Sequence, residues 1–380
     1  MHHAERGLFD LRQGRPFLVT DNARGTKAGP SGTAVLVAAV EGLDASTLRR
    51  LLALAAGAPR LVLTTHRIAA MGLGSTNGRG PAPYALPLDP SVDVGSLIEL
   101  SCGSLSAAAT RSAHLLTASP AETAGLSLVR LGRLLPAVVA VPVATPPDET
   151  LREALASGEM LQADASEVRD FVDAAGAEIV LVGEAPVPLV EAEDSRFMLF
   201  REAHGLQDHV AILVGPQSGW PDPVPVRLHS ACLTGDLFGS LRCDCGEQLH
   251  ASMDFFATRG GGVLLYLAQE GRGIGLRNKF RAYELQEGGL DTIEADGTLG
   301  FGPDERRYDV AVKILEALDV QRIELLTNNP QKVAAMEEAG ITVVRRVPLH
   351  GKLNRHNLPY VRAKVQRAGH WLGDMLSQPL

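Results

Sequence analysis

The sequence has few cysteines and no long apolar run, and each absence excludes a class of protein. Four cysteines in 380 residues are too few for a disulfide-rich secreted scaffold and favour a reducing compartment. The longest apolar stretch, residues 134–144, is short and contains Pro136 and Pro142. Because it is too short to span a bilayer and no apolar signal segment follows residues 1–6, we expect neither a membrane span nor an export signal. We therefore predict a cytoplasmic protein.

The chain also lacks an excess of positive charge. Its formal net charge is −8, which argues against a general nucleic-acid binder. An anionic small substrate remains compatible, because a local group of arginines can oppose the overall sign. At 45% hydrophobic residues, the chain is long enough for two domains with substantial cores.

The composition changes near the middle of the chain. Residues before about 190 contain one lysine, Lys27, and no tryptophan. The proline-containing stretch 184–188, followed by the acidic stretch 191–194, is typical of a linker. We therefore predict an α/β (α+β) protein with domains at residues 1–192 and 193–380.

The first half alternates strands and helices but offers no assignable chemical motif. Apolar runs at residues 16–20, 34–38 and 60–64 predict strands, and the spacing over residues 45–56 predicts a helix. Asp21 and Asn22 are interpreted as a turn at the end of a strand rather than as part of a site.

Three of the four cysteines, Cys232, Cys243 and Cys245, fall within one short segment. Thiolates favour zinc, and three protein ligands with a fourth position left to water are typical of a hydrolytic zinc site. A closed structural site with His229 or His250 as the fourth ligand is an alternative. A disulfide is the weakest interpretation, because adjacent Cys-x-Cys geometry is poor for a bridge. The isolated Cys102 is interpreted as a small buried hydrophobe.

A glycine-rich turn at residues 269–275 follows a predicted strand at residues 262–267 and precedes a helix that begins near Leu276. Glycines let backbone amides approach a phosphate, and a helix N-terminus favours negative charge. The pattern has the spacing of neither a dinucleotide fingerprint nor a P-loop. The nearby basic residues Arg272, Lys279 and Arg281 strengthen the phosphate interpretation. Tyr283 lies one helical turn after Lys279 and is either a site residue or a core residue.

The remaining polar residues come before and within a predicted βαβ unit. Asp304 and Glu305 would ordinarily complement a helix dipole, and Arg306 would be a surface charge. The βαβ unit has strands at 323–326 and 341–344, with Pro330 beginning its helix. Lys332, in the first turn of that helix, faces either a phosphate or solvent.

Together these segments resemble GTP cyclohydrolase II, a zinc enzyme that opens the guanine imidazole ring at the entry to riboflavin synthesis. The resemblance extends from about Arg196 to Gly373 and comprises six ordered motifs. The motifs are R-x-H-S-x-C-L-T-G-D at 227–236, L-R-C-D-C-G at 241–246, Q-E-G-R-G-I-G-L at 269–276, N-K-x-R-A-Y at 278–283, D-E-R at 304–306 and L-L-T-N-N-P-x-K at 325–332.

The resemblance implies a role for each matching position. The three clustered cysteines would hold one Zn²⁺ per subunit, which lowers the pKa of a water that attacks C8 of guanine, and a second hydrolysis would release formate. Tyr283 would assist the base chemistry and Asp304 would accept a proton. Arg306 is the family's proposed nucleophile or phosphate-side catalyst, and because a guanidinium stays protonated, charge stabilisation at the α-phosphate is the role that we expect. Mg²⁺ would accompany the triphosphate, and the protein would be a homodimer. The positions that would contact GTP are Arg227, His229, Ser230, Gln248, Glu270, Gly271, Arg272, Thr292, Thr327 and Lys332.

One residue departs from the family pattern. Ala231 stands where the family usually has glutamate, so a carboxylate near the substrate or metal is missing. This motivates a different class of function, a nucleotide-binding regulator that kept the site and lost turnover. The complete cysteine set, with Tyr283, Asp304 and Arg306, favours the enzyme. A related enzyme that opens a different purine or pyrimidine is a further alternative.

The N-terminal half resembles 3,4-dihydroxy-2-butanone 4-phosphate synthase at residues 11–19. That family continues with an acidic D-x-x-D-R-E-N-E-G-D stretch that holds magnesium and the sugar phosphate, whereas this chain has residues 21–29 with little acidic character. Hard cations need carboxylate oxygens. We therefore expect a degenerate, catalytically silent domain, rather than the second half of a bifunctional riboflavin enzyme.

Overall fold

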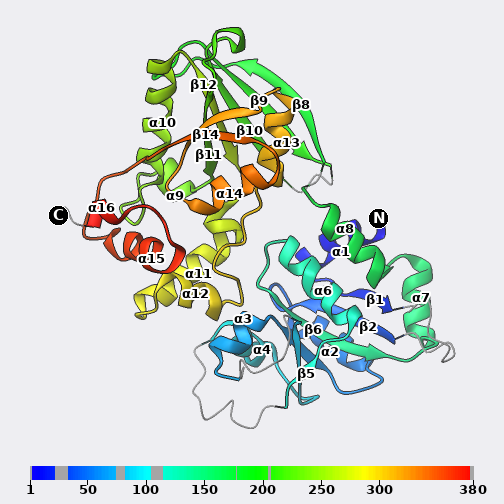
Figure 1. The fold of residues 1–380 in the computed structure, drawn as a ribbon. Helices are drawn as coiled ribbons and strands as arrows, with labels where there is room; N and C mark the ends of the chain where they lie inside the picture. Colours follow the sequence, from blue (N-terminus) through cyan, green and yellow to red (C-terminus); the bar gives the residue numbers. More distant parts are fainter. Residues whose placement is uncertain are drawn as a thin grey trace. The chain divides into compact units, whose positions relative to one another are not determined.

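The computed structural model describes residues 2–21, 33–73, 82–103, 114–176, 178–203 and 207–376. They form two compact units, each built on a seven-stranded sheet (Figure 1). The first unit comprises Met1–Ala174, Arg281–Leu285 and Glu294–Pro303, and the second comprises the remainder. The two-domain α/β prediction is confirmed. Residues 22–29, which carry the departure from the synthase pattern, lie outside the described residues.

The first unit has a mixed sheet in the order β5-β4-β3-β6-β2-β1-β7. Its strands are β1 (Phe17–Asp21), β2 (Thr33–Ala39), β3 (Arg60–Leu63), β4 (Tyr84–Pro87), β5 (Leu116–Thr117), β6 (Ala137–Val143) and β7 (Gln162–Asp164). Its helices are α1 (His2–Arg12), α2 (Ala45–Ala53), α3 (Thr65–Ala70), α4 (Val94–Cys102), α6 (Pro120–Leu131), α7 (Glu149–Ser157) and α8 (Ala165–Ala174). The predicted strands at residues 16–20, 34–38 and 60–64 and the helix at 45–56 are present.

Helices cover both faces of this first sheet because successive strand residues point in opposite directions. On one face, Leu36 of β2 joins a core cluster with Leu48 and Leu51 of α2. On the other face, Val37 packs against α6, where a Cβ at Gly125 would lie 2.8 Å from a Val37 methyl group. Gly125 therefore lets α6 approach the sheet closely.

The second unit has the order β14-β13-β11-β12-β10-β9-β8. Its strands are β8 (Ile179–Pro186), β9 (Ser195–Glu202), β10 (Asp208–Val214), β11 (Val224–Ser230), β12 (Gly262–Leu267), β13 (Arg322–Leu326) and β14 (Thr342–Val347). Its helices are α9 (Leu233–Asp236), α10 (Cys245–Arg259), α13 (Asp309–Ala317), α14 (Pro330–Glu338), α15 (Leu358–Ala368) and α16 (Gly373–Leu376), with short 3₁₀ turns η1 (Gln217–Gly219) and η2 (Glu270–Gly273). Residues of α11 (Leu276–Glu287) and α12 (Thr292–Thr298) are divided between the units.

Parallel pairing in one half of the second sheet brings the ends of several strands together. Strands β12, β11, β13 and β14 are paired in parallel, and β12, β10, β9 and β8 are paired antiparallel. Val263 and Leu265 of β12 pack in one core cluster with residues of α13, whereas Leu264 packs in another with Phe256 of α10. The loops that follow the parallel strands carry the sequence motifs, as expected where ligands bind to such sheets.

The boundary between the units lies earlier than the sequence predicts. The stretch 184–188 was expected to be a linker, but Glu184–Pro186 lie in β8, which pairs with β9. The segment accommodates Pro186 because β8 is an edge strand, which is paired on one side only. The compact units therefore divide between Ala174 and Ala175, not between residues 192 and 193. Among the described residues, no helix is both long and apolar enough to cross a membrane.

Arg67 of α3 binds the segment 294–303, which comes late in the sequence but belongs to the first unit. Its side chain is buried, and its guanidinium donates to the carbonyl oxygens of Leu100 at 2.9 Å, Gly103 at 2.8 Å and Thr298 at 2.9 Å. Thr64 adds a 2.6 Å hydrogen bond to the Gly300 carbonyl. Segment 294–303 is thus held by buried polar contacts rather than by apolar packing alone.

Replacement of Arg67 by Met should destabilise the first unit by about 3 kcal/mol or more, because several buried carbonyls lose their donor. The measurement is the denaturant midpoint of the first unit, with Arg169→Met as the matched control because Arg169 is exposed on α8. Equal midpoints for the two variants would contradict the role assigned to Arg67.

Candidate functional site

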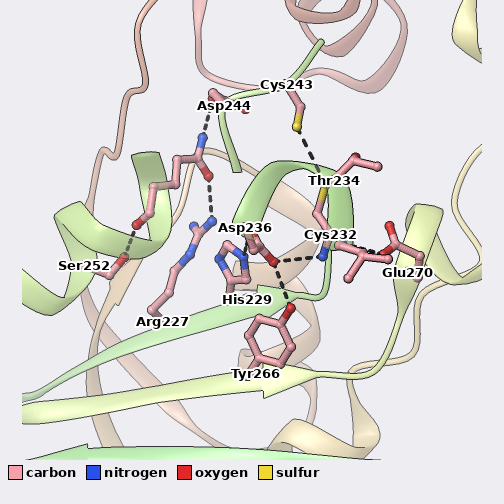
Figure 2. A network of polar contacts seen from close by, with 12 residues as sticks. Arg227, His229, Cys232, Thr234, Asp236, Cys243, Asp244, Ser252, Tyr266 and Glu270 are labelled. Atoms are coloured by element: carbon pink, nitrogen blue, oxygen red, sulfur yellow. Dashed lines mark hydrogen bonds and ion pairs between the residues drawn. The ribbon is translucent and has the colours of Figure 1, made fainter. Parts of the chain in front are cut away.

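Three cysteine side chains meet in the second unit, at the ends of β11 and α10; Figure 2 shows two of them, Cys232 and Cys243. Cys232 follows β11 and directly precedes α9, and Cys245 begins α10. The three sulfur atoms lie within 4.8 Å of one another, and the Sγ atoms of Cys232 and Cys243 are 3.6 Å apart. The structure therefore brings together the three cysteines that the sequence singled out.

Gly235 makes this close approach possible. A Cβ at this position would lie 2.7 Å from the Cys243 sulfur and 3.0 Å from the Cys232 sulfur. No side chain fits there, which explains why glycine occupies this position of the L-T-G-D segment.

The cysteine cluster fits a tetrahedral metal ion. Zinc–sulfur bonds of about 2.3 Å place tetrahedral sulfur ligands about 3.8 Å apart, close to the separation of Cys232 and Cys243. Three sulfur ligands also leave a fourth position to a non-protein ligand. The group is thus able to bind a metal of the kind that prefers thiolates.

The charges of the cluster also favour a cation. Hydrogen bonds from the other two cysteines, supported by the charge of Lys279, lower the pKa of Cys232. The hydrogen bond with Cys232 is the main reason that the pKa of Cys243 rises to about 11. A divalent cation would displace the protons of the cysteines, because the thiolate is the form that binds metal. The Lys279 ammonium group lies 3.3 Å from the Cys232 sulfur and 2.8 Å from Glu270, a contact that the sequence did not predict.

The histidines considered as a fourth ligand are engaged elsewhere. His229 Nε2 lies 3.0 Å from Asp236, and His250 Nδ1 lies 2.6 Å from Glu191 at the surface. Among the described residues, the group of candidate ligands contains the three cysteines and no histidine. Cys102 is separate from this group, at the end of α4, and is half-buried rather than fully buried as predicted.

Asp236 holds the cysteine loop against the sheet (Figure 2). Its carboxylate accepts hydrogen bonds from the Cys232 amide at 2.9 Å and from the Tyr266 hydroxyl at 3.0 Å. Because a carboxylate only accepts, His229 must donate through Nε2 and present Nδ1 as an acceptor. Within the described residues, His229 Nδ1 and Ser230 Oγ are buried without a partner. These two predicted contact residues therefore have capacity for a ligand.

Arg227 links the cysteine loop to a group of buried cations. Its guanidinium donates to Gln248 at 2.6 Å and to the Leu326 carbonyl at 3.0 Å. Burial lowers the pKa of Arg227 to about 10, so the group remains charged at neutral pH. Gln248 in turn donates to Asp244, which lies between two of the cysteines.

Lys332 and Arg306 add to this cation group. Lys332 is buried and donates to the Leu228 carbonyl at 2.7 Å. Burial, reinforced by the charges of Arg227 and Arg306, lowers the pKa of Lys332 well below its ordinary value. Lys332 is therefore not the solvent-exposed lysine of the alternative interpretation.

Asp304 and Arg306 form a close ion pair, with Arg306 Nε 2.8 Å from Asp304 Oδ1. Burial by itself raises the pKa of Asp304, but the hydrogen bonds and charge of Arg306 outweigh it and hold this pKa below its ordinary value. Both side chains precede α13 and are mostly buried, so neither is the surface charge that a dipole argument suggests.

The glycine-rich turn forms η2 and has left-handed backbone angles at Gly271, Arg272 and Gly273, with φ of 63°, 61° and 93°. A Cβ at Gly273 would lie 2.7 Å from the Glu305 carbonyl oxygen, so glycine lets the loop of Asp304 pack against η2. Glu270 accepts from the Leu233 amide at 2.7 Å and so ties η2 to α9. Left-handed geometry at the non-glycine Arg272 is costly and is typical of a functional turn.

The other predicted residues lie further along the same segments. Thr327 is buried and its hydroxyl accepts from the Asn329 amide at 3.0 Å, in the turn before α14. Tyr283 lies in the part of α11 that groups with the first unit, and Thr292 begins α12. Their roles remain predictions.

The comparisons with known proteins agree with this arrangement. The family model described as GTP cyclohydrolase II matches residues 180–348. A GTP cyclohydrolase-2 of Xylella fastidiosa strain 9a5c is 41% identical over 376 residues, covering 96% of this chain and 86% of that protein. The chain belongs to the GTP cyclohydrolase II family.

Further relatives differ in how much of this chain they match. A GTP cyclohydrolase-2 of Azospirillum brasilense is 38% identical and covers 97% of this chain and 94% of that protein. One from Pseudomonas syringae pv. tomato is 48% identical over 196 residues, covering 52% of this chain but 95% of that protein. A solved two-domain 3,4-dihydroxy-2-butanone 4-phosphate synthase from A. baumannii is 14% identical with a TM-score of 0.35, covering 92% of this chain and 99% of that one.

Replacement of Gly235 by Ala in this GTP cyclohydrolase II family member should greatly reduce metal retention, because the added methyl group occupies the space between the sulfurs. The measurement is the metal content of the purified protein. Gly297→Ala is the control, since a Cβ at Gly297 meets nothing within 4 Å. Equal metal content in both variants would show that the cysteines do not hold the metal in this geometry.

Proposed function

We propose that this chain hydrolyses GTP to 2,5-diamino-6-(5-phosphoribosylamino)pyrimidin-4(3H)-one, formate and pyrophosphate in riboflavin biosynthesis. The observation that carries the proposal is a three-cysteine group beside a group of buried cations, in a member of the GTP cyclohydrolase II family. The three-cysteine group suits ring-opening hydrolysis, and the buried cations suit the binding of a triphosphate.

Zinc is the metal that we assign to Cys232, Cys243 and Cys245, and when bound it would supply the Lewis acidity that makes water nucleophilic at neutral pH. The protein's own part is to hold the sulfurs in place. Lys279 compensates the charge of Cys232, while Asp236 fixes the turn that carries it.

The buried cations supply the site for the phosphates. Arg227, Arg306 and Lys332 lie close enough to affect one another's pKa, and Asp304 pairs with one of them. An unbalanced group of buried positive charges is costly unless an anion neutralises it. A triphosphate, accompanied by Mg²⁺, would provide that charge.

Asp304 and Arg306 would act at the phosphate end of the substrate. The guanidinium of Arg306 stays protonated because Asp304 raises its pKa against the effect of burial, so its role is to stabilise negative charge that develops during loss of pyrophosphate. Asp304 is ionised and able to accept a proton, as the family resemblance implies. Tyr283 would assist at the base.

The residues that match the GTP cyclohydrolase II family model, 180–348, lie mostly in the second unit. This supports assigning most of the reaction's residues to the second unit, with Tyr283 in the first. Ala231 keeps its place at the end of β11 by donating to the Leu267 carbonyl at 2.8 Å. The backbone next to Cys232 therefore stays hydrogen-bonded at the end of the sheet, although alanine stands where the family usually has glutamate.

Purified protein incubated with GTP, Mg²⁺ and zinc should release formate and pyrophosphate together with the diaminopyrimidine. Cys243→Ser should lose both zinc and all three products, because the thiolate holds the metal that activates water. Cys102→Ser is the matched control and should retain both, since Cys102 lies outside the cysteine group.

Two outcomes would contradict the proposal. Full activity with retained zinc in Cys243→Ser would show that Cys243 is not a ligand of the zinc ion. Zinc and GTP binding in the unchanged protein without any product would favour the nucleotide-binding regulator.

Binding of inorganic triphosphate should take up protons in the pH range where Lys332 titrates, because the phosphate charge raises the lowered pKa of Lys332. Titration calorimetry in two buffers of different ionisation enthalpy measures this uptake. Lys332→Arg should bind without it, since a guanidinium is already protonated. The same uptake in both proteins would assign the proton to another group.

A further inference from the structure

The chain beyond residue 348, where the family-model match ends, returns to the functional site. Lys364 of α15 lies 3.4 Å from Asp244 between the cysteines. Tyr360 of α15 lies under the guanidinium of Arg272, 5.9 Å from ring centroid to Cζ. The Trp371 amide donates to the Asn328 carbonyl at 3.0 Å. The C-terminal segment therefore contacts the cysteine segment, the glycine-rich turn and the turn before α14.

Lys364 reaches both parts of the site from α15. Its side chain is only 13% exposed, and its ammonium group lies 4.1 Å from the centroid of the Tyr360 ring. The 3.4 Å contact to Asp244 is long for a charge-assisted hydrogen bond. Because an ammonium group has three donors, Asp244 and Tyr360 leave it able to bind a further acceptor.

The same ammonium group belongs to the buried cation group. The charge of Lys364 contributes to lowering the pKa of Lys332. Burial and four neighbouring cations lower the pKa of His370 to about 3. The four cations are Lys364, Arg306, Lys332 and Arg272.

Among Arg227, Arg306, Lys332 and Lys364, the described carboxylates that pair with a member of the group are Asp304 and Asp244. Asp304 is paired with Arg306, and Asp244 faces both Lys364 and Arg227. Lys332 donates to a backbone carbonyl rather than to a carboxylate. Positive charge is therefore in excess where α15 meets the loops, and a multiply charged anion is the ligand that fits it.

We propose that Lys364 is a further substrate ligand that binds the phosphates of the nucleotide, so that α15 completes the phosphate site. This inference rests on the proposed function for the identity of the nucleotide. Its chemistry requires only a polyphosphate.

A purely structural role for Lys364 makes a different prediction. If Lys364 served only to hold Asp244, its loss would disturb Cys243 and Cys245 and would lower zinc content and kcat. If Lys364 binds phosphate, its loss raises KM for GTP and weakens binding of inorganic triphosphate, while zinc content stays the same.

The experiment compares Lys364→Met and Lys364→Arg with Arg362→Met in the full-length, zinc-loaded protein. Arg362 is exposed on the same helix, so its replacement removes the same charge away from the site. Lys364→Met should weaken triphosphate binding by about tenfold or more, with a matching rise in KM. Lys364→Arg should restore most of the affinity, and Arg362→Met should behave like the unchanged protein.

The two proposals fail in distinguishable ways. Absence of GTP turnover in the unchanged protein would overturn the proposed function, while triphosphate binding would still test Lys364. Unchanged triphosphate affinity in Lys364→Met, an equal loss in Arg362→Met, or no triphosphate binding by the unchanged protein would overturn the inference.

Discussion

The buried carboxylate of Asp244 is the constraint on which the rest of the site depends. It lies between Cys243 and Cys245 and accepts hydrogen bonds from Gln248 and Lys364. Burial by itself raises the pKa of Asp244, but the charge of Lys364 outweighs it and keeps the carboxylate ionised. One anion therefore anchors the thiolate segment and the cations that face it.

The compact units do not follow the order of the sequence. Segments 281–285 and 294–303 belong to the first unit, although both neighbouring stretches of chain belong to the second. Arg67 and Thr64 hold the later segment through backbone carbonyls, and Arg281 pairs with Glu41 at 2.9 Å. Pro303 ends that segment and Asp304 follows it directly. The first unit thus holds the segment that carries Tyr283 and the segment that directly precedes Asp304, two residues with predicted catalytic roles.

Local sequence patterns predicted those strands and helices whose formation depends on a single segment. The apolar run at residues 262–267 is β12, and the strand–helix–strand pattern around Pro330 is the parallel pair β13 and β14 with α14. The linker prediction was wrong because prolines and acidic residues are also compatible with an edge strand, here β8. Such a stretch forms a strand only when a partner is present, and here that partner is β9, which lies outside the stretch itself.

The sequence by itself determined the family, the three cysteines and the motifs that surround them, because their spacing within short segments limits what they can bind. The tertiary structure decided which charges meet. Lys279 lies against Cys232, Lys332 is buried, and Lys364 reaches Asp244 across 120 residues of sequence. An isolated lysine in a sequence is most often solvated, since burial of a charge is costly. Only the folding of distant segments around the same point supplies the carboxylates, carbonyls and neighbouring cations that give these lysines their role.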